Sequence, residues 1–274
     1  MRAAALVLAL LPASAAAQEA PVEMVPEAEA TAPAENPVET SPEPAQRPQD
    51  LSGDVAEDPP ETAEAEPVMD DAARPTAPGE GVRDRLALAD ADYDACLADL
   101  AAIGATFAPA DPIVAEDDAD CGVLRPVELS ELLPGIAFDP PAPLRCPAAL
   151  AAARWTRDFV LPAAARAGRG DLVAIDHGST YVCRRRNGQP DGKPSEHSFG
   201  NAIDVMGFRF AEGDPIRIQP RERDGTLAEA FQDAVRASAC LEFTTVLGPG
   251  SDAFHDDHLH LDVVGRDGGF RLCQ

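Results

Sequence analysis

The sequence predicts an α+β fold: a single disulfide-stapled domain with a mainly antiparallel sheet flanked by helices, preceded by a disordered tether. Three observations lead to this prediction. Six cysteines in a chain that begins like an exported protein can form three disulfides. Helix and strand patterns alternate irregularly over residues 82–274, without the regular βαβ order of a parallel sheet. The preceding residues, 18–81, carry too little apolar surface to build a core.

The first 17 residues predict a secretory signal peptide. Arg2 supplies the positive start, residues 3–11 an apolar run, and residues 15–17 the small side chains before a cleavage site near Ala17. We therefore expect an exported, periplasmic protein in an oxidising compartment. No run of 18 apolar residues follows, which predicts no transmembrane segment in the mature chain.

Residues 18–81 form the predicted tether. Of these 64 residues, 17 are Asp or Glu, 2 are Arg and 12 are Pro. Proline removes backbone donors and like charges repel, so an extended acidic segment is expected. It is either a spacer across the cell envelope or a tail without a specific role. The chain has a net charge of −26, which argues against a nucleic-acid partner.

The first helices of the folded part, residues 82–274, are predicted from the spacing of apolar residues and from the positions of proline and glycine. Residues 92–103 place Cys96 and Leu100 on one helical side. Pro147 suits the first turn of a second helix, and the following Ala-rich stretch favours a helix over residues 147–165. The glycines that follow end it.

The elements after this helix alternate between strand and helix. Residues 171–176 form a short buried apolar run, and residues 200–210 alternate, so both predict strands. Residues 227–237 predict a third helix. Strands are expected again at residues 241–247 and 258–264.

Two short segments carry the chemistry: SEHSFGNAID at residues 195–204 and HDDHLHLD at residues 255–262. Together they hold four of the five histidines in the chain. In the second segment His258, His260 and Asp262 share one strand face, and leucines occupy the other. Because the apolar face packs on the core, we expect the histidine face to line a cleft.

These residues suit a zinc site. His197, Asp204 and one histidine of the HxH pair would supply three protein ligands and keep a fourth position open. The sequence has no HExxH, P-loop or GxSxG motif, which removes several hydrolase classes. The alternative for His197 and Asp204 is an ordinary surface pair, but it leaves the histidine-rich strand face unexplained.

Read together, the segments give S-x-H-x-x-G-x-A-x-D followed by D-H-x-H. This pattern resembles the zinc site of the metallopeptidase group that contains the D-Ala-D-Ala carboxypeptidases, the lysostaphin-type endopeptidases and the Hedgehog signalling domain. Residues 96–273 also resemble the bacterial extensin-like C-terminal domain family, through GSTYVCRRRNG, SEHSFGNAIDVMGF and TVLGPGSDAFHDDHLHLD. Residues 82–274 are therefore expected to be an extensin-like C-terminal, metallopeptidase-like domain.

The resemblance implies a zinc peptidase that hydrolyses peptidoglycan stem peptides or cross-links, as an endopeptidase or a carboxypeptidase. It implies Zn²⁺ ligation by His197, Asp204 and His260. Asp257 would carry the proton, with neighbouring Asp256 as the alternative, and His258 would stabilise the oxyanion. Two other readings remain open: a catalytically inactive, zinc-stabilised cell-wall-binding module, and a purely structural disulfide domain.

Three consecutive arginines stand out in an acidic domain. On an extended chain Arg184 and Arg186 point one way and Arg185 the other. The metallopeptidase group has a similar Tyr-Arg segment upstream of its first histidine, which implies that Arg184 and Tyr181 bind substrate. A guanidinium group binds a carboxylate with two parallel hydrogen bonds. A solvated turn is the alternative.

The cysteine spacing suggests sequential disulfides, and we expect the pairs Cys96–Cys121, Cys146–Cys183 and Cys240–Cys273 among the 15 connectivities that six cysteines allow. Three further residues near the motifs receive lesser roles. His177 ends an expected buried strand and is interpreted as structural. His255 lies before the second motif and is expected to be solvated. Asp262 is interpreted as a surface residue of its strand, with support of a metal ligand as the alternative.

Overall fold

A computed structural model describes residues 81–221, 223 and 225–274. The predicted signal peptide (1–17) and the predicted tether up to residue 80 lie outside the described residues. The helices are α1 (Val82–Arg85), α2 (Asp90–Ile103), α3 (Cys146–Trp155), α4 (Leu161–Ala164) and α5 (Leu227–Glu242). The strands are β1 (Thr106–Pro109), β2 (Ile113–Val114), β3 (Gly122–Val123), β4 (Pro126–Leu133), β5 (Ile136–Arg145), β6 (Leu172–His177), β7 (Ala202–Phe210), β8 (Ile216–Arg217), β9 (Thr245–Leu247), β10 (Leu259–Asp262) and β11 (Leu272–Cys273).

A nine-stranded sheet organises these residues. Its order is β1-β4-β5-β6-β7-β10-β9-β11, with β8 beside β7, and β2 and β3 form a separate pair. All the pairings are antiparallel except β5 with β6 and β9 with β11. The predicted α+β class with a mainly antiparallel sheet is therefore confirmed. Among the described residues, no helix has the length and apolar character needed to cross a membrane.

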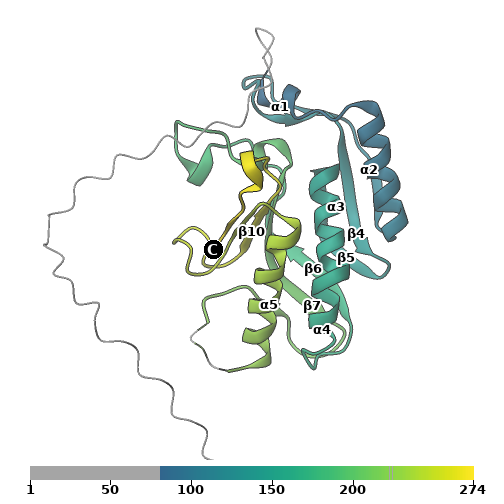
Figure 1. Cartoon of the computed structure of the whole chain (residues 1–274), viewed down its shortest axis with the longest axis vertical. Helices are drawn as coiled ribbons and strands as arrows, with labels where there is room; N and C mark the ends of the chain where they lie inside the picture. The colour runs from purple at the N-terminus through teal and green to yellow at the C-terminus, as the bar shows by residue number, and fades with distance from the viewer. Residues whose placement is uncertain (1–80, 222, 224) are drawn as a thin grey trace, which may run out of the picture. The chain divides into compact units, whose positions relative to one another are not determined.

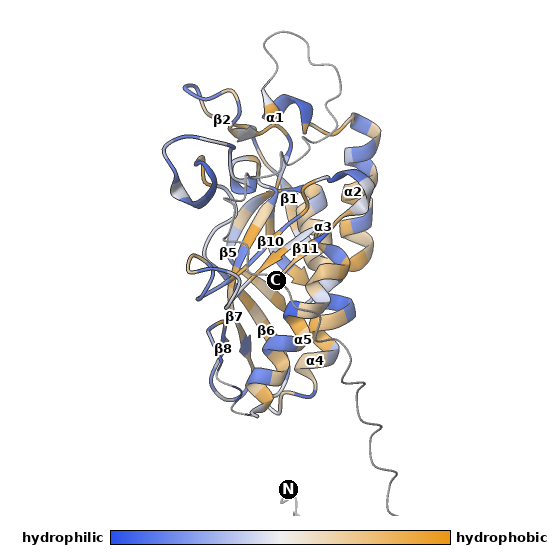
Figure 2. Ribbon diagram, turned by 60° about the vertical axis from the view of Figure 1, so that its left-hand side comes forward, coloured by the Kyte–Doolittle hydropathy of each residue, from blue (hydrophilic) through white to orange (hydrophobic). Residues whose placement is uncertain are grey.

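Helices cover one face of the sheet. Figure 2 shows α2, α3, α4 and α5 together on one side of the strands. Helix α3 packs against α2, α5, β4 and β5, and α4 continues its line after a π-helical turn (Figure 1). At the centre Trp155 meets Phe208 and Phe243 edge-on, with ring centroids 6.1 and 6.2 Å apart. Its indole N–H donates to the Val235 carbonyl at 3.1 Å, so the buried ring has no unpaired donor.

The predicted elements are present with shifted ends. Helix α5 runs on to Glu242, so the following strand is only Thr245–Leu247 rather than residues 241–247. The β4–β5 hairpin was not predicted, and the three prolines in residues 140–143 are unusual in a strand. The sheet accommodates them because β6 pairs with β5 only over residues 137–139. The remainder of β5 pairs with β4 alone, so fewer of its backbone donors are needed.

The disulfide pairing departs from the spacing rule. The bonds are Cys96–Cys146, Cys121–Cys183 and Cys240–Cys273, with no free cysteine among the described residues. The pair Cys240–Cys273 is confirmed, whereas the predicted Cys96–Cys121 and Cys146–Cys183 are wrong. Helix α2 packs against α3 and brings Cys96 to Cys146, with Cα atoms 6.2 Å apart. Tertiary packing, rather than proximity in sequence, decides the partners.

Candidate metal centre

His197 lies in a single 3-10 turn, Glu196–Phe199, that follows the loop after β6. Gly200 ends the turn with φ of 64°, a conformation that favours glycine. A Cβ atom there would lie 2.9 Å from the Val123 side chain and 3.2 Å from the Arg145 amide nitrogen. The turn can therefore pack closely against β3 and β5. This packing leaves the His197 imidazole with no exposed surface.

Asp204 and His260 come from the neighbouring strands β7 and β10, where they are direct cross-strand partners. The leucines on either side of His260, Leu259 and Leu261, have no exposed surface and face the core. The predicted alternation of this strand is thus confirmed. His260 and Asp204 share the opposite face of the sheet, on the side that receives His197.

Three donor atoms of these residues form a triangle. His197 Nε2, Asp204 Oδ1 and His260 Nδ1 are 3.1 Å apart in all three pairs. The nitrogen and oxygen ligands of a tetrahedral zinc ion, at bond lengths of about 2.0–2.2 Å, are about 3.3–3.5 Å from one another. The triangle is close to one face of such a tetrahedron.

Each of the three side chains also makes a hydrogen bond on the side that points away from the triangle. His197 donates from Nδ1 to the Thr180 carbonyl at 3.2 Å, and His260 donates from Nε2 to Asp262 at 3.3 Å. The Ser179 hydroxyl donates to Asp204 Oδ2 at 2.8 Å. In neutral histidines these bonds place the protons on the outer nitrogens, so lone pairs face the centre of the triangle. Three converging lone pairs repel one another unless a cation lies between them, and the residues therefore fit a metal ion.

Asp262 is buried, with 4% of its surface exposed. Besides its bond to His260, its carboxylate accepts from the Val264 amide at 3.1 Å. The interpretation as a surface strand residue is wrong, because β9 and the loop after β10 cover this end of the strand. Asp262 instead orients the imidazole of His260, a candidate metal ligand, which is the alternative that the shared strand face indicated.

The electrostatics of the triangle follow from this arrangement. Burial opposes charge on Asp204, but the hydrogen bonds of His197 and His260 outweigh it and hold the pKa of Asp204 well below its usual range. Burial likewise opposes charge on His260, but Asp204 and Asp262 outweigh it and raise the pKa of His260 to about 9. The carboxylates thus favour positive charge at this point, either a proton or a cation.

His197, Asp204 and His260 form one of two groups in the described residues with donor atoms close enough to hold a metal ion. The second group comprises Asp118, Cys121 and Cys183. Its two cysteines are joined in a disulfide, so they provide no thiolate ligand. The first group is therefore the candidate metal centre of the described residues.

The two predicted catalytic residues, Asp257 and His258, lie at the edge of the candidate metal centre. His258 Nε2 is 3.5 Å from Asp204 Oδ1, and its Nδ1 donates to Asp257 Oδ1 at 2.8 Å. The Asp257 side chain is 79% exposed. Asp256, the alternative to Asp257, accepts from the Gly250 amide at 3.4 Å. The structure thus brings His258 to the metal triangle directly and Asp257 through His258.

His255 is closer to the centre than the sequence indicated. It is buried, its Nδ1 donates to Asp252 at 2.7 Å, and its ring centroid lies 5.2 Å from His258 and 5.7 Å from His260. The expectation of a solvated loop residue is wrong, because the loop folds back over the two histidines. Its clustering with the other histidines in sequence was the signal that could have found it.

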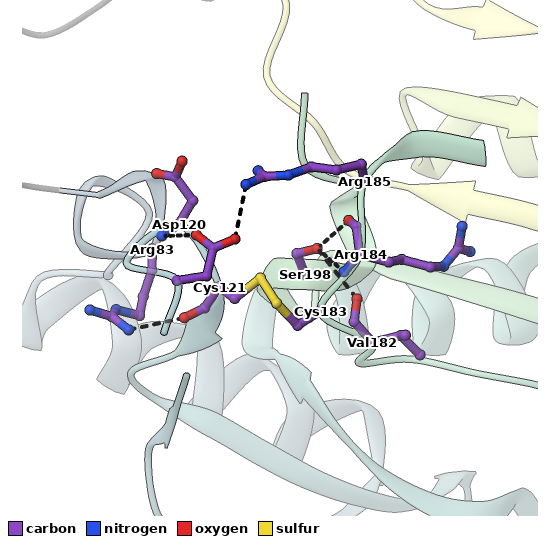
Figure 3. Close-up of a disulfide and its surroundings, with 9 residues drawn as sticks. Arg83, Asp120, Cys121, Val182, Cys183, Arg184, Arg185 and Ser198 are labelled. Carbon is purple, nitrogen blue, oxygen red and sulfur yellow. Dashed lines mark hydrogen bonds and ion pairs between the residues drawn. A yellow bond between two sulfur atoms is a disulfide. The ribbon is translucent and has the colours of Figure 1, made fainter. Parts of the chain in front are cut away.

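A cavity of about 130 Å³ adjoins the centre and has His260 in its wall. Arg184 and Arg186 line this cavity, whereas Arg185 pairs with Asp118 at 3.0 Å on the other side. Figure 3 shows the side chains of Arg184 and Arg185 leaving the chain in opposite directions. The predicted alternation of the arginines is therefore confirmed. Tyr181 is not among the residues that line the cavity, and its substrate-binding role stays a prediction.

Arg266 and Glu196 also line the cavity, and sequence reasoning did not single them out. Glu196 directly precedes His197, a candidate metal ligand, which was a usable signal. It is buried, and burial together with the charge of Asp262 raises its pKa. Arg266 lies in the irregular segment between β10 and β11, where no sequence pattern indicated a role.

The family model described as Extensin-like protein C-terminus matches residues 94–274. The chain belongs to this family. No curated protein and no solved structure matched the chain. The matched part of this extensin-like domain includes all six cysteines, the metal triangle and every residue named in the cavity. Helix α1 and the first four residues of α2 precede it.

Proposed function

We propose that the extensin-like domain is a periplasmic zinc-dependent peptidase that hydrolyses peptide bonds of peptidoglycan stem peptides or cross-links. The observation that carries the proposal is the triangle of His197, Asp204 and His260, in which three lone pairs converge. A zinc site with three protein ligands keeps a position open for a reactant, as catalytic sites do. The motif resemblance to zinc metallopeptidases of the cell wall supports the substrate class.

The bound zinc would supply a Lewis acid for the scissile carbonyl and acidify water. The residues of the chain have separate tasks. Asp204 and the two histidines hold the ion, and Asp262 fixes the orientation of His260. Asp257 uses Oδ1 to accept the Nδ1 proton of His258, so its Oδ2 is available to take a proton from water and pass it to the leaving amine.

The bond from His258 to Asp257 also determines what His258 can do. With Nδ1 donating to Asp257, only the protonated imidazole has a second N–H, at Nε2, to offer to an oxyanion. In that form the Nε2 N–H, which lies 3.5 Å from Asp204 Oδ1, would be the group that stabilises an oxyanion.

A second candidate is a zinc-stabilised wall-binding module without turnover. The exposure of Asp257 favours it, because a carboxylate in contact with solvent is a weaker general base than a partly buried one. Both candidates predict zinc and a peptide ligand, and they differ only in hydrolysis.

Incubation of muropeptides with the zinc-loaded protein, read by mass spectrometry, separates the candidates. The peptidase predicts cleaved products from the wild type, none from Asp257→Ala, and retained activity in the matched control Asp256→Ala. Zinc content measured in all three proteins shows that a loss of cleavage is not a loss of metal. Zinc binding with no cleavage by the wild type would favour the module, and a protein without zinc would contradict both.

A further inference from the structure

Two arginines that face the cavity have no carboxylate partner among the described residues. The guanidinium of Arg184 makes neither a hydrogen bond nor an ion pair there. Arg266 donates to the Thr244 carbonyl at 2.8 Å and to the Thr245 hydroxyl at 2.6 Å, both of them neutral acceptors. Each arginine thus brings a full positive charge that no neighbouring side chain neutralises.

The carboxylates that share the cavity wall are engaged elsewhere. Asp262 accepts from His260 and from the Val264 amide. Glu196 accepts from Asn201 at 2.9 Å and is 3.5 Å from Arg186. Of the three arginines that line the cavity, Arg186 is therefore partly neutralised, and the unbalanced charge belongs to Arg184 and Arg266.

The guanidinium of Arg266 and the backbone of Arg184 are held before any ligand binds. The two threonine contacts fix the plane of the Arg266 guanidinium and leave three of its five N–H groups for a ligand. The backbone of Arg184 is fixed by Ser198, whose hydroxyl lies 3.1 Å from the Arg184 amide and 2.8 Å from its carbonyl. The adjoining Cys183 is bonded to Cys121 (Figure 3). The Arg266 guanidinium, fixed in advance, therefore loses little entropy when an anion binds.

The net charge restricts the kind of anion. The folded part, residues 82–274, contains 19 Lys and Arg against 31 Asp and Glu, so its long-range field repels a polyanion. Two local guanidinium groups in a small cavity instead suit a compact anion, and their planar N–H pairs match the two oxygens of a carboxylate.

We propose that Arg184 and Arg266 together form a carboxylate-binding site for the substrate, a step that rests on the proposed peptidase function for the identity of the ligand. The carboxylate is either the C-terminus of a stem peptide or a side-chain carboxylate within it. The first source would mark a carboxypeptidase-type substrate, and the second is compatible with cleavage inside the peptide.

The test uses the full mature chain with Asp257→Ala, so that hydrolysis does not disturb binding. Calorimetry compares three stem peptides: one with all carboxylates free, one with a C-terminal carboxamide, and one with amidated side-chain carboxylates. We expect the free acid to bind more tightly than one amidated form by on the order of tenfold or more. Which amidation weakens binding identifies the source of the carboxylate.

Arg184→Gln and Arg266→Gln should each reduce that discrimination to less than about threefold, because one guanidinium is lost from the pair. Arg185→Gln removes the same charge from the adjacent residue, whose side chain points away from the cavity. This variant should preserve the discrimination between the peptides. Since Arg266 also contacts Thr244 and Thr245, thermal unfolding checks the folding of its variant. Arg184, whose guanidinium has no partner among the described residues, provides the test free of that concern.

Equal binding of the three peptides, or full discrimination in both arginine variants, would overturn the carboxylate site. The proposed function fails separately, through absence of zinc or of cleavage by the wild type. A protein that discriminates the peptides without cleaving them would keep the carboxylate site as part of a binding module.

Discussion

Asp204 and His260 lie directly opposite each other in β7 and β10, and Oδ1 of the first is 3.1 Å from Nδ1 of the second. Opposite residues in an antiparallel pair have Cβ atoms about 4.5–5.5 Å apart, so their side chains can share one ligand. The buried Leu259 and Leu261 fix this register, because a slip of one residue would turn His260 toward the core. The sheet itself therefore provides two of the three corners of the metal triangle.

Removal of any ligand of the triangle should abolish stoichiometric zinc. We expect about one zinc per wild-type chain by elemental analysis, and far less in His197→Ala, Asp204→Ala or His260→Ala, since two ligands bind zinc weakly. His258→Ala is the matched control from the same strand segment. It should keep its zinc and lose peptidase activity. Stoichiometric zinc in His260→Ala would contradict the ligand assignment.

Asp262→Asn should weaken zinc binding without removing a ligand. The amide has nearly the same shape but no charge, so it holds the His260 Nε2 proton less strongly and makes Nδ1 a poorer donor to the metal. Zinc affinity, measured by competition with a chelator, should fall by about 10–100-fold. Asp256→Asn, a change of the same kind in the loop before β10, should leave the affinity unaltered. Equal affinities in the wild type and Asp262→Asn would show that Asp262 is not coupled to the metal.

Peptide mapping under non-reducing conditions should find Cys96–Cys146, Cys121–Cys183 and Cys240–Cys273. The first pair closes the chain between residues 50 positions apart, and in the chain-entropy model its removal should cost about 4 kcal/mol of unfolding free energy. Denaturant unfolding of the double variant Cys96→Ala, Cys146→Ala measures that loss. Mapped peptides joined as Cys96–Cys121 would contradict this connectivity and support the sequential one.

The sequence predicted what depends on local pattern. Alternation in residues 258–262 correctly separated His260 from the core leucines, and the spacing of the three arginines correctly turned Arg185 away from the other two. The disulfide partners of Cys96 and Cys121 were missed, because they depend on how α2 and the segment before β3 pack. The position of Arg266 in the cavity wall was missed for the same reason, since only the completed sheet brings its segment to the cavity.

His177 should make the domain less stable in mild acid. Burial lowers its pKa, and this effect outweighs the bond from Nε2 to the Pro140 carbonyl and the charges of Asp139, Asp204 and Asp176. The folded protein thus binds fewer protons at His177 than the unfolded chain, whose histidine has a pKa of about 6.5. The corresponding stability is complete above that pH and is lost as the pH falls through the folded-state pKa.

His177→Gln keeps a donor for Pro140 but does not titrate. Between about pH 7 and pH 5 its unfolding free energy should decline less steeply than that of the wild type. Both proteins need the same zinc loading, so that protonation of the metal ligands contributes equally to the two curves. Parallel curves would mean that His177 does not contribute to the acid sensitivity.

Arg184→Ala should lower kcat/KM by on the order of 10²-fold, about 2.7 kcal/mol of transition-state binding, because the guanidinium faces the cavity. Zinc content and thermal stability should stay close to the wild type, since the Arg184 guanidinium makes no hydrogen bond or ion pair with a described residue and the backbone bonds of Arg184 persist in the variant. Arg185→Ala loses the partly buried pair with Asp118, which points away from the cavity, and should change the kinetics little. Steady-state kinetics on one stem-peptide substrate gives kcat/KM for the wild type and for both arginine variants. Unaltered kinetics in Arg184→Ala, under conditions where Asp257→Ala is inactive, would reduce the arginine to part of a solvated turn.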